Sequence, residues 1–300
     1  MKTVLSLIKR NTKLFFKDKG LFFTSLITPC ILLVLYATFL GNVYRDSFLL
    51  NVPEGFEMSE KLLNGAVGGQ LIASILAVSC VTVAFCSNML MVQDKANGSI
   101  RDLTVSPVKG SYLALGYYIS TLISTLSVCF TATAVCLIYL GCTGWYLSIG
   151  DVLMLFFAVF LLTMFGTAFS SVINFFLSTQ GQISAVGTIV SSGYGFLCGA
   201  YMPISQFGDG LQKVISFLPG TYGTSLLRNH ALRGALSELE AQGIPEEAVD
   251  GMRDAIDCNL YFFDTKVDLG VMLAVLATTV VVLLCVYILL NLRKMKKFGR

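Results

Sequence analysis

The chain has 300 residues, of which 55% are hydrophobic and only 13% charged. Soluble domains carry about a quarter charged residues, so a soluble fold of this composition would expose large apolar patches to water. The net charge of +3 is too small to indicate a nucleic-acid partner. Composition therefore excludes an ordinary soluble domain, and the position of the few charges becomes informative.

Long stretches of the chain contain no charged residue at all. They are Leu21–Tyr44, Gly65–Val92, Gly110–Gly150, Val152–Gly208 and Leu269–Leu292. About 20 apolar residues cross a bilayer core as a helix. Only helices and closed barrels can do so, because lipid offers the backbone no hydrogen-bond partner. The stretches lack the alternation of a barrel, so they predict an all-α polytopic membrane protein.

Six transmembrane helices fit these stretches, and they form a predicted domain over residues 21–292. The predicted spans are about Leu21–Leu40, Ala66–Val92, Gly110–Leu140, Asp151–Leu177, Ile183–Tyr201 and Leu269–Leu290. Pro29 predicts a kink in the first span, and residues 178–182 predict a very short turn before the fifth. An outer loop of about residues 202–267 precedes the last span.

Basic residues give the predicted orientation. Most Lys and Arg residues lie before the first span, between the second and third spans, and in the tail of residues 293–300. The positive-inside rule then places both termini in the cytoplasm. Residues 1–20 alternate basic and apolar side chains, which predicts an amphipathic helix on the inner membrane surface rather than a cleaved signal peptide. This helix could serve only as a lipid anchor or also contact a partner protein.

The spans contain no ionisable residue near their centres. Proton relays, many ion-coupled carriers and membrane enzymes need such residues, so these classes are disfavoured. No spacing of Cys and His indicates a metal. The embedded Gln70, Asn88 and Asn174 could line a path, but the favoured interpretation is that they hold helices together by hydrogen bonds.

The segment between the second and third spans is the most informative interruption. Asn97-Gly98 predicts a turn. Residues 99–106 predict a short helix that Ser99 caps and that ends before Pro107. Such a helix could transmit a movement of a cytoplasmic protein to the membrane helices, although a simple connecting loop would have the same sequence features.

This segment resembles the coupling helix of the permease subunits of type-2 ABC transporters. The resemblance rests on Asp94, Gly98, Ser99, Ile100, Arg101, Asp102, Leu103, Ser106 and Pro107. It implies that these residues dock on an ATPase. Asp102 stands where Glu is common in the family, and Asp94 precedes Gly98 by four residues; neither departure removes a charge type.

A second stretch after the fifth span is also similar to the family. Its residues are Gly199, Pro203, Ser205, Leu211, Gln212, Pro219, Tyr222 and Arg228. The two prolines leave 204–218 as an element too short to cross, which the resemblance identifies as a re-entrant helix near the exit; an interfacial loop is the alternative. Further on, residues 244–257 predict a small amphipathic helix whose acidic face, including Asp257, is solvated.

The resemblance implies the permease subunit of an ATP-driven exporter that moves a hydrophobic or amphipathic substrate such as a drug, a lipid or a peptide-like molecule. The chain has no Gly-x-x-x-x-Gly-Lys-Ser/Thr motif, so ATP and Mg are expected on a separate ATPase chain and no cofactor on this one. Two permeases, as a homo- or heterodimer, and two ATPases are expected in the plasma membrane of a bacterial cell. The competing class is a channel or scaffold that ATP does not drive.

Overall fold

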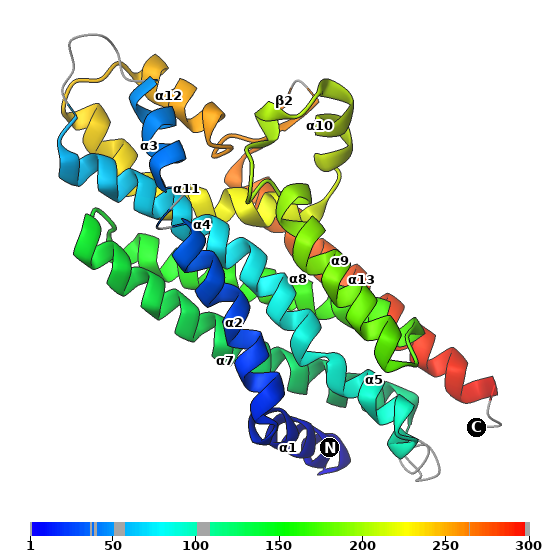
Figure 1. The fold of residues 1–300 in the computed structure, drawn as a ribbon. Coiled ribbons are helices and arrows are strands. Elements are labelled where there is room, and N and C mark those ends of the chain that lie inside the picture. Colours follow the sequence, from blue (N-terminus) through cyan, green and yellow to red (C-terminus); the bar gives the residue numbers. More distant parts are fainter. Residues whose placement is uncertain are drawn as a thin grey trace.

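The computed structural model describes residues 2–36, 38, 41–50, 58–100, 109–263 and 265–297. The described chain is mostly helical, with a single small hairpin, and its long helices form a bundle (Figure 1). Helix α1 (Lys2–Lys17), helix α5 (Met89–Ala96) and the last turns of α13 (Leu269–Lys297) lie at one end of the bundle, which we call the terminal end. Helices α3 (Gly41–Leu50), α10 (Asp209–Ile215) and α12 (Glu246–Ala255) and the hairpin lie at the opposite, distal end (Figure 1).

The described helices and strands occur in the following order along the chain. They are α1 (Lys2–Lys17), α2 (Lys19–Leu35), α3 (Gly41–Leu50), α4 (Glu60–Ser87), α5 (Met89–Ala96), α7 (Gly110–Thr143), α8 (Ile149–Phe176), α9 (Gln180–Leu197), the short helical turn η2 (Ile204–Gln206), α10 (Asp209–Ile215), α11 (Pro219–Ala241), α12 (Glu246–Ala255), β1 (Tyr261–Phe262), β2 (Thr265–Lys266) and α13 (Leu269–Lys297). Strands β1 and β2 pair antiparallel.

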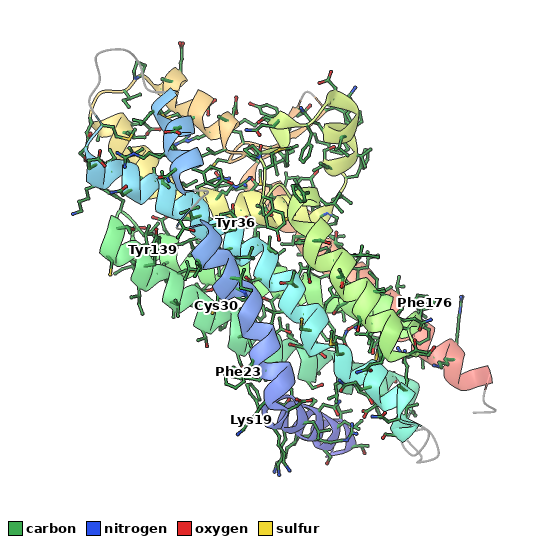
Figure 2. The ribbon with its side chains drawn as sticks, viewed as in Figure 1. Lys19, Phe23, Cys30, Tyr36, Tyr139 and Phe176 are labelled. Carbon is green, nitrogen blue, oxygen red and sulfur yellow. The ribbon has the colours of Figure 1, made fainter. Side chains whose placement is uncertain are left out.

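Four helical stretches of the described chain are long and apolar enough to cross a membrane. They are Glu60–Ala96, Gly110–Thr143, Ile149–Phe176 and Leu269–Lys294. They correspond to the predicted second, third, fourth and sixth spans, which confirms a polytopic helical membrane protein. The predicted first and fifth spans fall on α2, with 17 residues, and α9, with 18. Figure 2 shows α2 running from Lys19 at the terminal end to Tyr36 towards the distal end, with Pro29 inside the helix.

Side-chain caps define two of the helix starts. Ser148 accepts a hydrogen bond from the Asp151 backbone N–H, and the Asp151 carboxylate accepts one from the Ser148 backbone N–H, so α8 begins with a capping box. Thr179 and Gln182 form the same motif at the start of α9. The turn between these helices is therefore shorter than the predicted residues 178–182, because Gln180 is already helical.

Asn88 joins three helices at the junction of α4 and α5. Its Nδ2 donates to Ser170 Oγ and Ser171 Oγ, both at 3.0 Å, and its Oδ1 accepts from Thr121 Oγ1 at 3.4 Å. Asn174 Nδ2 donates to the Asn88 carbonyl at 3.4 Å. These bonds confirm the helix-joining interpretation for Asn88 and Asn174, since buried polar groups in an apolar bundle need partners.

Helix α11 is the main element that the sequence analysis did not identify. Its 23 residues lie inside the predicted outer loop, and Pro219, taken there as a helix breaker, is the first residue of the helix. The predicted element 204–218 is divided into η2 and α10. Helix α11 packs against α4, α8 and α13, and most of its residues are buried.

Small residues let α11 approach its neighbours closely. A Cβ on Gly223 would lie 2.5 Å from Leu162 Cδ1, and a Cβ on Gly69 of α4 would lie 2.7 Å from the Ala231 carbonyl oxygen. Close backbone approach through small residues is how helices pack in membranes. The buried residues of α11 also include polar ones such as Ser225, Arg228 and His230, so the hydropathy of this helix gives little signal.

Gly234 provides a test of this close packing. A Cβ at this position would lie 1.8 Å from the backbone oxygen of Tyr146, so Gly234→Ala must displace backbone. We expect the substitution to destabilise the protein by about 3 kcal/mol, measured by thermal unfolding in detergent. The control is Gly251→Ala in α12, where a Cβ meets nothing within 4 Å and a gain of about 0.5–1 kcal/mol is expected. Equal behaviour of the two variants would contradict the packing described for α11.

Candidate functional site

A buried carboxylate at the terminal end connects three helices. Asp94 of α5 accepts two hydrogen bonds from the Arg10 guanidinium, Nη1 to Oδ2 at 2.7 Å and Nη2 to Oδ1 at 3.0 Å. The Tyr117 hydroxyl of α7 donates to Asp94 Oδ2 at 2.6 Å. The Asp94 side chain is 8% exposed, so these bonds replace most of its contact with water. We call Arg10, Asp94 and Tyr117 the Asp94 cluster.

The packing of α1 aims Arg10 at this carboxylate. Leu7, Asn11 and Phe15 are buried and lie four residues apart, so they form one face of the helix. Leu7 packs at Gly116, where a Cβ would lie 3.1 Å from Leu7 Cβ. The amphipathic helix predicted for residues 1–20 is observed as α1, over Lys2–Lys17. Some of its apolar residues lie outside the buried face, since Leu5 is 69% exposed. The hydrogen bond that Arg10 donates to Asp94 raises the pKa of Arg10, which keeps the guanidinium charged.

Lys95, the next residue of α5, caps the C-terminus of α8. Its Nζ donates to the carbonyls of Asn174 at 2.8 Å, Phe175 at 2.7 Å and Leu177 at 2.9 Å. A cation at this position satisfies the unpaired carbonyls and interacts favourably with the helix dipole. The ammonium group also lies 5.5 Å from the centre of the Phe175 ring, and Lys294 of α13 lies 5.4 Å from the same ring.

Charge-assisted hydrogen bonds therefore hold helix α5 on both sides, through Asp94 to α1 and α7 and through Lys95 to α8. The predicted coupling segment follows directly. Gly98 has φ +78, which agrees with the predicted turn, and helical backbone begins at Ser99 and Ile100. Arg101, Asp102, Leu103, Ser106 and Pro107 lie outside the described residues, so their role stays a prediction. The sequence offered no signal that Arg10 and Tyr117 would join Asp94, because the contacts span 84 and 23 residues.

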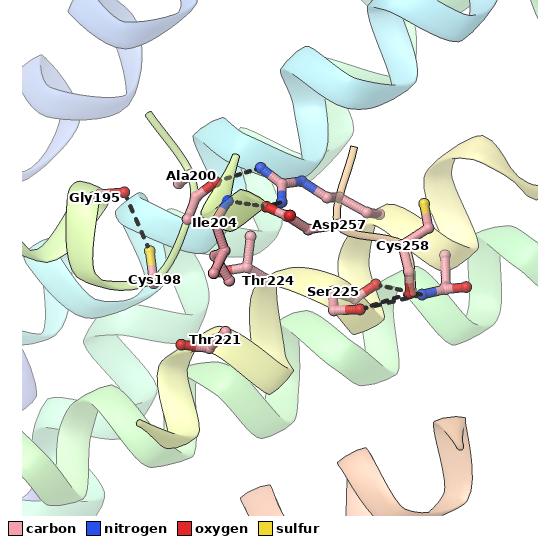
Figure 3. Close-up of polar contacts among 12 residues, drawn as sticks. Gly195, Cys198, Ala200, Ile204, Thr221, Thr224, Ser225, Asp257 and Cys258 are labelled. Carbon is pink, nitrogen blue, oxygen red and sulfur yellow. Dashed lines mark hydrogen bonds and ion pairs between the residues drawn. The ribbon is translucent and has the colours of Figure 1, made fainter. Parts of the chain in front are cut away.

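A second ionic contact lies within the distal half of the bundle. Arg228 of α11 is fully buried and donates from Nη1 to Asp257 Oδ2 at 2.9 Å. Its Nη2 donates to the Gly199 carbonyl. The backbone N–H of Ile204 donates to the same Asp257 oxygen at 2.8 Å, and Figure 3 shows these two residues side by side. We call Gly199, Arg228 and Asp257 the Arg228 cluster.

The burial of Asp257 corrects one prediction. The sequence analysis put this residue on the solvated acidic face of the helix predicted over residues 244–257, but only 4% of it is exposed. Helix α12 ends at Ala255, and Asp257 has φ +53, so its side chain leaves the helical pattern and turns inwards. Val249 and Met252 are buried as predicted, which confirms the apolar face of the helix.

The other residues of the second family-like stretch hold the short helices in place. Gln212 Nε2 donates to the Phe207 carbonyl at 2.7 Å, and the Tyr222 hydroxyl donates to the Ser216 carbonyl at 2.6 Å. Pro203 precedes η2 and Ser205 lies within it, whereas Leu211 of α10 is 44% exposed. Of the predicted set, the structure thus brings Gly199 and Arg228 into direct contact and leaves Leu211 at the surface.

Two cavities flank this segment. A polar cavity of about 420 Å³ lies between α10 and the chain that leaves α12, and Gln212, Asp254 and Asn259 are among its lining residues. An apolar crevice of about 580 Å³ lies between α8, α9 and α13, with the start of α11 as a further wall. No group of three or more metal-ligating side chains occurs in the described part of the chain.

The long apolar helices, which enclose a polar cluster at the terminal end and a buried ion pair in the distal half, define a polytopic helical membrane protein. The sequence model of the ABC-2 type transporter family matches residues 2–231, and the chain belongs to this family. The match covers α1 to α10 and the first half of α11, so it includes both clusters except Asp257. Curated proteins give no match. Membership identifies a permease, which is a transport subunit rather than a catalytic one, and proteins of this family normally work with ATPase partners in a membrane.

Proposed function

We propose that the protein is the permease subunit of an ATP-driven exporter, powered by a separate ATPase chain. The observation that carries this proposal is the Asp94 cluster. It ties α1 and α7 to α5 directly before the segment that resembles a coupling helix. A movement of that segment would reach three helices at once through charge-assisted hydrogen bonds, which are the stronger ones in proteins.

In this proposal the chain crosses the membrane six times and both termini are cytoplasmic. Helices α2 and α9 provide the first and fifth spans. The basic residues of α1 and those at the end of α13 support the orientation, because both helix segments lie at the terminal end. Helix α10 and the turn η2 would then form the re-entrant element on the outer side.

The proposed exporter contains two permease subunits. The exposed face of α9 supports pairing, since it presents small hydroxyl residues whose side chains bond back to their own helix. Ser184, Thr188 and Ser192 each donate to the carbonyl four residues earlier, at 3.2, 2.9 and 2.6 Å. A face without free polar groups and without bulk suits close helix contact in a membrane. The proposed substrate is hydrophobic or amphipathic.

Co-purification tests this function. We expect the protein, gently solubilised from its native membrane, to bring down a soluble protein with a Walker motif and ATPase activity. The variant Ile100→Asp places a charge in the coupling segment and should lower the yield of that partner at least fivefold. The matched control Glu247→Gln, on the exposed side of α12, should leave the yield unchanged. A homo-oligomer without ATPase would instead favour a channel or scaffold.

A further inference from the structure

The apolar crevice has walls from four separate helices. Phe165 and Phe169 of α8, Val190 of α9 and Leu283 of α13 line it, and Pro219 and Gly220 at the start of α11 close one end. Its volume of about 580 Å³ lies within the range of small-molecule sites. Helix α9 packs chiefly on α4 and α5, so its opposite side is free to form this wall.

Helix α9 is patterned for such a wall. Val186, Ile189, Val190 and Leu197 line the crevice at spacings of three, four and seven residues, which places them on one face of the helix. Gly193 lies within this face, and a Cβ on it would meet nothing within 4 Å. The crevice therefore has open space beside Gly193, which no neighbouring side chain fills.

A polar group without a partner lies at the closed end. Tyr194 lines the crevice, is 8% exposed, and its hydroxyl has no hydrogen-bond partner among the described residues. The hydroxyl lies directly at Gly220, where a Cβ would be 2.5 Å from it. A buried hydroxyl without a partner costs about 1–3 kcal/mol, so the site favours a guest that can bond with it.

The start of α11 adds a preference for an acceptor. No side chain caps this helix, and its first residues, Pro219 and Gly220, line the crevice. Pro219 has no N–H and the Thr221 N–H donates to the Leu218 carbonyl at 3.1 Å, which leaves the Gly220 N–H. This group and the partial positive charge of the helix N-terminus favour an oxygen acceptor or an anion. The remainder of the crevice offers hydrocarbon, apart from the hydroxyl of Thr279.

We propose that the crevice binds an amphipathic molecule with one hydrocarbon chain. Its head carries an oxygen acceptor, such as a carboxylate, that meets the Tyr194 hydroxyl and the start of α11. The inference deepens the proposed function and rests on it only in treating the bound molecule as a transport substrate. Because α9 and α13 form the sides of the crevice, the molecule reaches it laterally from the membrane.

Photolabelling of the permease alone, in nanodiscs without ATPase or ATP, tests the site. Two diazirine probes of equal chain length are used, one ending in a carboxylate and the other in a methyl group. We expect the carboxylate probe to label peptides of α8, α9 and α13. Gly193→Leu extends a side chain into the crevice from a Cβ that meets nothing within 4 Å, and it should reduce this labelling at least fivefold. The matched control Gly181→Leu lies on the same helix, also has open space at its Cβ, and should label normally.

Tyr194→Phe tests the binding of the head group separately from the binding of the hydrocarbon chain. Loss of one hydrogen bond should lower labelling by the carboxylate probe about fivefold and leave labelling by the methyl probe unchanged. Equal labelling of Gly193→Leu and the unaltered protein would overturn the site, and equal loss of both probes in Tyr194→Phe would overturn the role of the hydroxyl. Labelling that survives in a protein that binds no ATPase would leave the site standing and refute only the proposed exporter function.

Discussion

Asp94→Asn should uncouple ATP hydrolysis from transport. The amide keeps the shape of the side chain but removes the charge that holds the Arg10 guanidinium at 2.7 and 3.0 Å. Hydrogen bonds to charged groups contribute about 1.5–3 kcal/mol, so α1 should be held at least tenfold more weakly. In proteoliposomes that contain the permease and its ATPase, we expect ATP hydrolysis to continue while substrate transported per ATP falls about tenfold.

Further variants distinguish loss of the Arg10–Asp94 charge pair from general destabilisation of the fold. Arg10→Gln should match Asp94→Asn, and the double variant should be little worse than either single one, because both remove the same interaction. Lys13→Gln is the matched control, since this lysine lies on the exposed side of α1. Normal coupling in Asp94→Asn with an unchanged unfolding temperature would show that the Asp94 cluster is only architectural.

Asp257→Ala should strongly destabilise the protein. The substitution leaves the fully buried Arg228 without its carboxylate and the Ile204 N–H without an acceptor. Breaking a buried ion pair on one side costs about 3–5 kcal/mol, because the remaining charge has lost its solvent and its partner. The alanine must also adopt φ +53, which Asp and Asn tolerate better than most residues. We expect a large fall in the thermal unfolding midpoint in detergent.

Two further variants test the cause of this effect. Asp257→Asn keeps the backbone angle and removes only the negative charge, so it isolates the loss of the ion pair. The double variant Asp257→Asn with Arg228→Met also removes the unpaired positive charge, so it should recover part of the lost stability. The control is Asp250→Asn, which breaks the exposed contact with Lys266 at 3.2 Å and should cost less than about 1 kcal/mol. Similar losses for the two carboxylates would mean that water reaches Arg228.

The Arg228 cluster explains why the second family-like stretch has its particular residues. Gly199 has φ +73, which ends α9 and turns its carbonyl towards Arg228. The ion pair then fixes the entry to η2 through Ile204. The segment that we propose as re-entrant is thus attached to the centre of the bundle, and a change in α11 would be passed to it directly.

Hydropathy by itself determined the class of the protein, because burial in lipid depends on the local run of side chains. The same local reasoning located the four long apolar helices and the turn at Gly98, whose causes lie within a few residues. It did not find α11, since polar residues and a buried ion pair are mixed with the buried leucines of that helix and leave no long apolar run.

Only the tertiary structure decided which polar residues meet. Arg10 and Asp94 are 84 residues apart, and Arg228 and Asp257 are 29 apart. Neither pair has a periodic signal, because each depends on how whole helices pack. The crevice has the same origin, since Gly193, Tyr194 and Gly220 each look ordinary in the sequence and form a site only where α8, α9, α11 and α13 converge. Composition fixes the solvent that a chain prefers, whereas the geometry of helix packing fixes its sites.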